Sequence, residues 1–262
     1  MRASERVLKG LNTLVSVAAA LVLLGVGAYC AYALWDNGQV YAAVDSVQEG
    51  LLQMKPSPEE ENGPTFEELR AVNPDVCGWL TLDGTQIDYP VLQGENNLTY
   101  INTDVYGEFA LAGSIFLDSG CDRTFHGPYF LIYGHHMDNS RMFGDLDLYK
   151  DQSFFEGNSS GSLILPDRSY DLEIFACLLV PSSEDAVFDT QQWQAGIHGL
   201  LDFISSSAMY VRQDVVDEMR AAKDAVQILA MSTCASEYTD ARTIIMAKMK
   251  LHSPEGKQEG NS

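Results

Sequence analysis

An uncharged apolar segment, Gly10 to Trp35, constrains this chain more than any other part of its sequence. The segment is rich in Leu, Val and Ala. A helix of about 20 apolar residues crosses the hydrocarbon core of a bilayer, and only a helix or a closed barrel satisfies its own backbone hydrogen bonds in lipid. Residues 10–35 are therefore predicted to form a transmembrane helix.

The charges on either side of this helix predict its orientation. Residues 1–9 carry a net charge of +2, and Asp36 follows the apolar segment. By the positive-inside rule, residues 1–9 lie in the cytoplasm and the bulk of the chain lies outside. We interpret the segment as a retained signal anchor. A cleaved signal peptide, with Ala31-Tyr32-Ala33 as its cleavage site, is the alternative, although the apolar run exceeds the usual length of about 7–15 residues.

The composition of the chain is that of an acidic globular protein. Of its 262 residues, 46% are hydrophobic and 20% are charged, which excludes a disordered or collagen-like chain. The formal net charge of -21 argues against a nucleic-acid binder, because such a protein neutralises phosphates with Lys and Arg.

After the apolar segment, the sequence predicts a connecting region, one folded domain and a tail. The connecting region, residues 36–64, has helical apolar spacing over Val40–Gln53 and a linker rich in Pro and Glu over Lys55–Pro64. Thr65 and Glu68 match a capping box, which begins a helix at the start of the folded domain, residues 65–252. Residues 253–262 are a polar tail.

The folded domain is predicted to be mainly β with flanking helices. Asp83-Gly84 marks a hairpin, and many short apolar runs separated by Gly and Asp favour a barrel or sandwich over a βαβ fold. One late helix is predicted over Thr190–Ser205. The expected strands are Trp79–Leu82, Gln86–Tyr89, Gly113–Leu117, Tyr129–Tyr133, Ser162–Leu165, Leu172–Val180, Val226–Met231 and Thr243–Lys250.

Four of the five cysteines lie outside the apolar segment, and their spacing shows no dense disulfide framework. Cys77 and Cys177 adjoin apolar strand residues and are predicted to be buried small hydrophobic residues. A Cys77–Cys121 disulfide stays open as an alternative. No C-x-x-C pair occurs, so the sequence gives little support for a structural zinc site.

Cys234 and a distant histidine are the best candidates for covalent chemistry. Cys234 follows one predicted strand and Arg242 begins the next, so antiparallel pairing would bring both side chains to one end of the sheet. A nearby cation favours the thiolate. Gly134-His135-His136 ends another strand, and adjacent residues of an extended chain face opposite ways, which leaves one ring for acid–base chemistry. From spacing alone, a structural cysteine remains the commoner outcome.

Several short motifs, taken together and in order, make the sequence similar to the class B sortases, the membrane-anchored cysteine transpeptidases of Gram-positive bacteria. The resemblance covers about Phe66 to Lys250. The motifs that carry it are Asn73-Pro74-Asp75 with Gly78-Trp79, Ile87-Asp88-Tyr89-Pro90-Val91, Asn97 with Tyr100, Gly113-Ser114-Ile115-Phe116-Leu117-Asp118, Tyr133-Gly134-His135 with Met137, Met142-Phe143, and Ser232-Thr233-Cys234 followed by Ala241-Arg242-Thr243.

The resemblance implies a fold and a set of site residues. The fold is a closed β-barrel of about eight strands, with amino-terminal helices and an extra helix before the last strands. By position, Cys234 matches the family's nucleophile, His135 its catalytic histidine and Arg242 its catalytic arginine. The residues implied for substrate binding are Thr233, Ser232, Asn97 and Tyr100. The resemblance implies neither a metal nor a cofactor.

The implied reaction is a transpeptidation at the cell surface. Cys234 cleaves a carboxyl-terminal sorting signal of a secreted protein through a thioester, and an amino group of a cell-wall peptide or a pilin takes the acyl group. The implied location is the cell membrane, with a single span and an extracellular catalytic domain. The alternatives that stay open are a membrane-anchored cysteine protease, a non-catalytic wall-binding barrel and a zinc hydrolase that uses His135 and His136.

Overall fold

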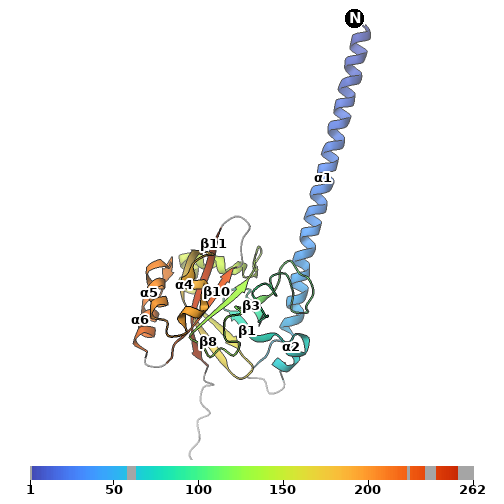
Figure 1. Ribbon diagram of the computed structural model, residues 1–262. Coiled ribbons are helices and arrows are strands. Elements are labelled where there is room, and N and C mark those ends of the chain that lie inside the picture. The colour runs from blue at the N-terminus through green and yellow to red at the C-terminus, as the bar shows by residue number, and fades with distance from the viewer. Residues whose placement is uncertain (1, 58–62, 223–224, 234–239, 253–262) are drawn as a thin grey trace, which may run out of the picture. The chain divides into compact units, whose positions relative to one another are not determined.

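A computed structural model describes residues 2–57, 63–222, 225–233 and 240–252 (Figure 1). The chain divides into two units, residues 1–46 and residues 47–262. Helix α1, Arg2–Leu52, makes up the first unit and ends in the second. The helix expected separately over Val40–Gln53 is therefore the last part of α1. This helix is long and apolar enough to cross a membrane, and none of its most apolar stretch is buried.

The end of α1 and helix α2, Phe66–Val72, belong to one apolar cluster of the second unit. Leu51 and Leu69 are both buried in that cluster. The Thr65 side chain accepts a hydrogen bond from the Glu68 backbone N–H, and the Glu68 carboxylate accepts one from the Thr65 backbone N–H. The predicted capping box is confirmed, and it fixes where α2 begins.

Eight strands close into a barrel, as the resemblance to the class B sortases implies. Their order around the barrel is β11-β10-β4-β3-β2-β1-β7-β8, and pairing of β8 with β11 closes it. The eight strands are β1 (Val76–Leu82), β2 (Asp88–Leu92), β3 (Ile115–Leu117), β4 (Tyr129–Gly134), β7 (Ser160–Ile164), β8 (Ser169–Pro181), β10 (Gln227–Thr233) and β11 (Ala241–Leu251).

Three further strands are two residues long. β5 (His136–Met137) and β6 (Arg141–Met142) pair with each other as a small separate hairpin. β9 (Tyr210–Val211) pairs with β8 outside the ring of eight.

Helices cover part of the outer surface of the barrel, and this explains the continuous apolar runs in the strands. Figure 1 shows α5 (His198–Ser207) and α6 (Gln213–Ala221) lying beside each other on one side of the strands. Leu200 of α5 and Val216 of α6 are fully buried in one cluster with Ile228 and Ile244 of the strands. Because these strands are covered on both faces, they bury consecutive residues instead of alternating ones.

The late helix differs from the prediction over Thr190–Ser205. The segment is a 3₁₀ helix η2, Thr190–Trp193, followed by α5. Gly196 separates them with a φ of 145°, which lies outside the helical region and which L side chains rarely adopt. Helices that the sequence analysis missed are η1 (Gly144–Lys150), α3 (Gln152–Gly157), α4 (Asp185–Phe188) and α6.

Cys77, Cys121 and Cys177 are free thiols, so the alternative Cys77–Cys121 disulfide is wrong. All three are buried, as predicted for Cys77 and Cys177. Burial disfavours the thiolate and raises the pKa of each of these three thiols to about 12. They act as small apolar residues of the core.

Candidate active site

Two parallel strands end together beside the predicted catalytic histidine. β4 and β10 pair in parallel, from Tyr129 opposite Ile228 to Gly134 opposite Thr233. Because both strands run the same way, the chain leaves Gly134 and Thr233 at the same end of the barrel. His135 is the next residue after Gly134. The predicted nucleophile, Cys234, follows Thr233 in the sequence and lies outside the described residues.

The third strand, β11, brings the predicted arginine to this end. It pairs antiparallel with β10, with Ile244 opposite Ser232, which confirms the antiparallel pairing that the sequence analysis required. The Thr243 backbone N–H donates a hydrogen bond of 3.3 Å to Thr233 Oγ1. Arg242 directly precedes Thr243, and it is half-buried.

One N–H group of the Arg242 guanidinium has no hydrogen-bond acceptor among the described residues. Among the residues that the structure describes, its Nη1 atom is buried and has no hydrogen-bond partner. A buried donor without a partner costs free energy, and a guanidinium binds carboxylate or oxyanion oxygens strongly. The atom is therefore suited to receive an oxygen atom from a bound substrate.

One ring nitrogen of His135 is held by the backbone. Nε2 lies 2.7 Å from the carbonyl oxygen of Ile101, and since a carbonyl only accepts, Nε2 must carry the hydrogen. The ring of the adjacent residue, His136, lies near a different residue: its Nδ1 is 3.7 Å from Asp147 Oδ2. The two rings thus serve different neighbours, as expected for adjacent residues of an extended segment.

Ser232 and Thr233, predicted to bind substrate, are the last residues of β10. Ser232 is fully buried and donates from Oγ to the Thr233 carbonyl at 3.1 Å, while Thr233 is 6% exposed. Thr233 Oγ1 already accepts from the neighbouring strand. Their contacts hold the end of β10 in place, and a direct contact with substrate stays a prediction.

Asn97 and Tyr100, also predicted to bind substrate, use their polar atoms within the fold. Asn97 Nδ2 donates to Asp118 Oδ2 at 2.7 Å, and its Oδ1 accepts from the Ser119 N–H. The Tyr100 hydroxyl donates to Asp75 at 2.8 Å, and burial raises its pKa to about 12. These contacts stabilise the segment that leads to Ile101, and substrate binding by Asn97 and Tyr100 stays a prediction.

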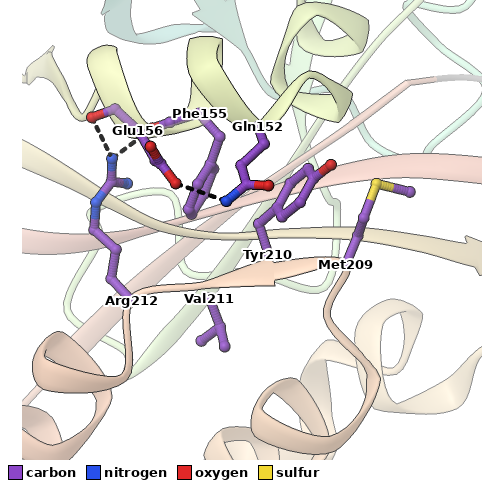
Figure 2. A pocket seen from close by; sticks show the side chains of 7 residues that line it. All are labelled: Gln152, Phe155, Glu156, Met209, Tyr210, Val211 and Arg212. Atoms are coloured by element: carbon purple, nitrogen blue, oxygen red, sulfur yellow. Dashed lines mark hydrogen bonds between the residues drawn. The ribbon is translucent and has the colours of Figure 1, made fainter.

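A pocket of about 350 Å³ lies elsewhere, between α3 and β9 (Figure 2). Arg212 lies across the Phe155 ring and donates to the carbonyl oxygens of Phe155 and Glu156. No described residue of the predicted site lines this pocket. Its lining residues are Gln152, Phe155, Glu156, Met209, Tyr210, Val211 and Arg212.

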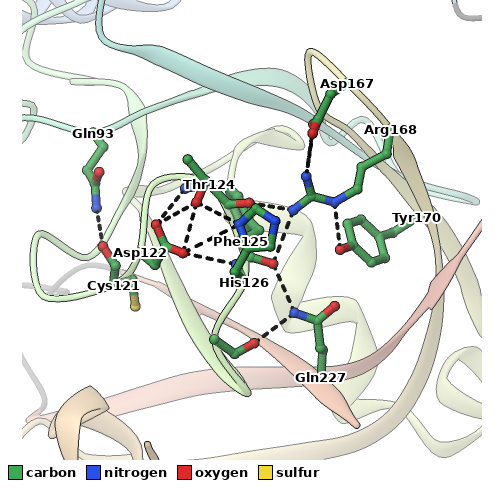
Figure 3. Close-up of polar contacts among 11 residues, drawn as sticks. Gln93, Cys121, Asp122, Thr124, Phe125, His126, Asp167, Arg168, Tyr170 and Gln227 are labelled. Carbon is green, nitrogen blue, oxygen red and sulfur yellow. Dashed lines mark hydrogen bonds and ion pairs between the residues drawn. The ribbon is translucent and has the colours of Figure 1, made fainter. Parts of the chain in front are cut away.

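A cluster of hydrogen-bonded polar residues stabilises the loop that precedes β4 (Figure 3). It lies at the start of β4, whereas His135 follows the end of that strand. Asp122 accepts hydrogen bonds from the backbone N–H groups of Thr124 and His126. Gln227, the first residue of β10, donates to the carbonyl oxygens of Phe125 and Gly127. The cluster anchors the start of both parallel strands, so we assign it to structure.

Two groups at the site were not found from the sequence. The Ile101 carbonyl is a backbone group, for which the sequence carries no signal. Asp147 lies in η1, and no local sequence pattern distinguishes it from Asp145 two residues earlier. Among the described residues, no group of three His, Cys, Asp or Glu side chains lies close enough together to hold a metal ion.

Comparison with known proteins places this geometry in a family. No family model matches the sequence. The chain is 32% identical over 193 residues to sortase B of Listeria monocytogenes, covering 72% of this chain and 76% of that protein. The structure of Spy0129, a Streptococcus pyogenes class B sortase involved in pilus biogenesis, matches with a TM-score of 0.63 and 35% identity, over 71% of this chain and 97% of that one.

A second solved structure, a Staphylococcus aureus sortase B–substrate complex, matches with a TM-score of 0.62 and 28% identity, over 72% of this chain and 85% of that one. The closed barrel and the identity agree with the motifs read from the sequence. The similarity to sortases contradicts the alternative predictions of a non-catalytic barrel and of a zinc hydrolase. The chain belongs to the class B sortases, which are cysteine transpeptidases.

Proposed function

We propose that this enzyme cleaves a carboxyl-terminal sorting signal through a thioester on Cys234 and transfers the acyl group to an amine. The observation that carries the proposal is the parallel register of Gly134 and Thr233, because each of these residues directly precedes a proposed catalytic residue. Sorting signals are the general substrates of sortases, and the structural neighbour from S. aureus was solved with a substrate.

In the first half of the reaction, the Cys234 thiolate attacks the carbonyl carbon of the scissile peptide bond. The carbon–nitrogen bond breaks, and the His135 imidazolium gives its proton to the departing amine. In the second half, an acceptor amine attacks the thioester carbonyl and loses a proton to the His135 imidazole. The thiolate then leaves, and both catalytic groups return to their starting state.

The contact of His135 with the backbone supports a choice between its two ring nitrogens for the proton transfer. Nε2 donates to the Ile101 carbonyl, which fixes the plane of the ring. We therefore propose that Nδ1 exchanges the proton with the leaving and entering amines. Holding the ring by a backbone group reduces the freedom lost when the substrate binds.

Arg242 is proposed to stabilise negative charge. Its buried Nη1 donor lacks a partner in the described part of the chain, and the oxygen of a tetrahedral intermediate would supply one. A donor that is already in place where charge develops stabilises the transition state more than the ground state.

The proposed location is the outer face of the cell membrane. Sortases are cell-surface enzymes, and the apolar part of α1 fits a membrane anchor. We propose that residues 10–35 are the retained anchor and that the catalytic domain lies outside the cell, because the positive charges precede the anchor. The acceptor is proposed to be an amino group of a cell-wall peptide or a pilin.

The test is mass spectrometry of the acyl-enzyme formed by the full chain in detergent with a library of sorting peptides, with and without an amine acceptor. We expect an adduct on Cys234 and a peptide–amine product that depends on the acceptor. If the peptide is cleaved at the same rate without the amine and only the free acid forms, the enzyme is a hydrolase. An adduct on another residue, or no adduct, would contradict the proposal. Cys234→Ala, which should be inactive, is the control.

A further inference from the structure

We propose that Asp147 is a positioning residue that couples the three segments carrying the catalytic groups. The inference rests on the proposed function, since it concerns how His135, Cys234 and Arg242 are held. Asp147 lies in η1, a short helix outside the barrel strands, and it has no direct part in the chemistry proposed above.

The Asp147 carboxylate accepts a short hydrogen bond from the strand that carries Arg242. Thr243 Oγ1, on the next residue of β11, donates to Asp147 Oδ1 at 2.6 Å. Thr243 is 3% exposed, and a hydrogen bond from a hydroxyl to an ionised carboxylate is roughly twice as strong as one between neutral groups. The bond therefore fixes the end of β11 relative to η1.

The same threonine continues the connection to β10. Its backbone N–H donates to Thr233 Oγ1 at 3.3 Å. Thr233 is the residue immediately before Cys234 in the sequence. Asp147, Thr243 and Thr233 thus form a chain of two hydrogen bonds that runs from η1 to the strand preceding the proposed nucleophile.

A separate set of contacts joins η1 to the histidine segment. The Phe143 N–H, at the start of η1, donates to the His135 carbonyl at 2.9 Å. Further along η1, Asp147 Oδ2 lies 3.7 Å from Nδ1 of the His136 ring. η1 is therefore bonded to the residue proposed as the acid–base group and to the strand that carries the proposed arginine.

Charge supports the positioning role. Burial opposes ionisation of Asp147, but hydrogen bonds from Lys150 and Thr243 outweigh it, so the pKa of Asp147 is lowered. Asp147 is then ionised at neutral pH, and Lys150 Nζ, at 2.7 Å, balances its charge. We therefore expect Asp147 to act on the site through its hydrogen bonds rather than through an unbalanced negative charge.

The experiment is a double-mutant cycle in the full chain with Asp147→Leu, Thr243→Val and the two combined. The probe is the peptide that gives the most acyl-enzyme in the library screen. Each single variant should lower kcat about tenfold and leave KM within about twofold, because the reacting groups are misplaced but the peptide still binds. The kcat of the combined variant should be no lower than that of the less active single variant, because both substitutions break the same hydrogen bond.

Two further variants separate position from charge and from folding. Asp147→Asn keeps an oxygen acceptor for Thr243 and should retain kcat within about threefold of the wild type. Asp138→Leu removes an acid from the exposed turn between β5 and β6 and should leave kcat and KM unchanged. The thermal midpoint of every variant should stay well above the assay temperature.

The outcomes decide between two failures. If Cys234→Ala or His135→Ala keeps wild-type activity, the proposed function fails, and this inference fails with it. If those two variants are inactive, an unchanged kcat in Asp147→Leu overturns this inference alone. So does a loss in the combined variant that equals the product of the single losses, or a loss confined to KM.

Discussion

Gly134 packs so closely against Phe143 that a methyl group on its α-carbon would lie 2.7 Å from Cγ of that ring. The same methyl group would lie 2.4 Å from Cδ1 of Ile115 on β3. Both distances are far below van der Waals contact. The glycine before the proposed catalytic histidine is thus needed because Ile115 and Phe143 approach its α-carbon closely.

Gly134→Ala should therefore destabilise the fold. Overpacking of a buried site costs about 1–3 kcal/mol, since Ile115 and Phe143 must both shift. Urea unfolding of the full chain in detergent, followed by tryptophan fluorescence, measures the change. Gly157→Ala is the matched control, because a methyl group there meets nothing within 4 Å. Equal stability of the two variants would contradict the packing argument.

The three buried thiols should not compete with Cys234 for alkylating reagents. Their pKa values of about 12 leave almost no thiolate at pH 7.5, and the thiolate is the reactive form. Brief treatment with iodoacetamide followed by peptide mapping should label Cys234 and spare Cys77, Cys121 and Cys177. The same treatment in urea, where all the thiols become accessible, is the control. Labelling of a buried thiol as fast as Cys234 in the native protein would refute the expectation.

The two adjacent histidines should differ sharply in their effect on catalysis. His135→Ala should lower kcat about 100-fold or more, which is the scale of a general acid–base group. His136→Ala should cost about threefold or less, because it removes only a partly exposed contact with Asp147. Steady-state kinetics with the library peptide measures both. A loss in His136→Ala as large as that in His135→Ala would mean that the wrong ring has been assigned.

Acid should selectively remove a stabilising contribution from Asp122, in the cluster of Figure 3. Burial alone would raise the pKa of Asp122, but hydrogen bonds from Thr124 and His126 outweigh it and the pKa is lowered. A carboxylate with a lowered native pKa stabilises the fold above its unfolded value of about 3.9, and this contribution disappears as the pH falls through the native value.

Unfolding of wild type and Asp122→Asn between pH 7 and pH 2.5 tests this. The variant should be less stable at pH 7, and the difference should shrink below about pH 4. Asp138→Asn, in an exposed turn, is the control and should track the wild type throughout. A difference that grows as the pH falls would reverse the assigned direction of the pKa shift.

Local patterns predicted much of this fold. The capping box at Thr65, the hairpin at Asp83-Gly84 and the strand positions follow from spacing and turn chemistry that act over a few residues. The antiparallel pairing of β10 with β11, which the sequence analysis required for Arg242 to reach the end of β10, is also found in the structure.

Features that depend on tertiary contacts were not predicted. Helix α6 is short and largely polar, and it becomes recognisable only when Val215, Val216 and Met219 are seen against the barrel. The break at Gly196 lies inside a periodic apolar pattern. The contact of Asp147 with Thr243 joins residues 96 positions apart, and no local signal predicts which of several acids in η1 makes it.

Arg242 should be needed for activity and dispensable for stability. Nη1 of Arg242 is buried and has no hydrogen-bond partner in the described part of the chain, so the loss of that atom leaves no acceptor unsatisfied among those residues. Arg242→Ala should thus lower kcat/KM at least about tenfold, or roughly 1.4 kcal/mol of transition-state stabilisation, with an unchanged thermal midpoint. Arg242→Lys, which keeps the charge but loses the planar fork, should not restore full activity. A fall in stability that accounts for the lost activity would instead show that Arg242 supports the barrel rather than the reaction.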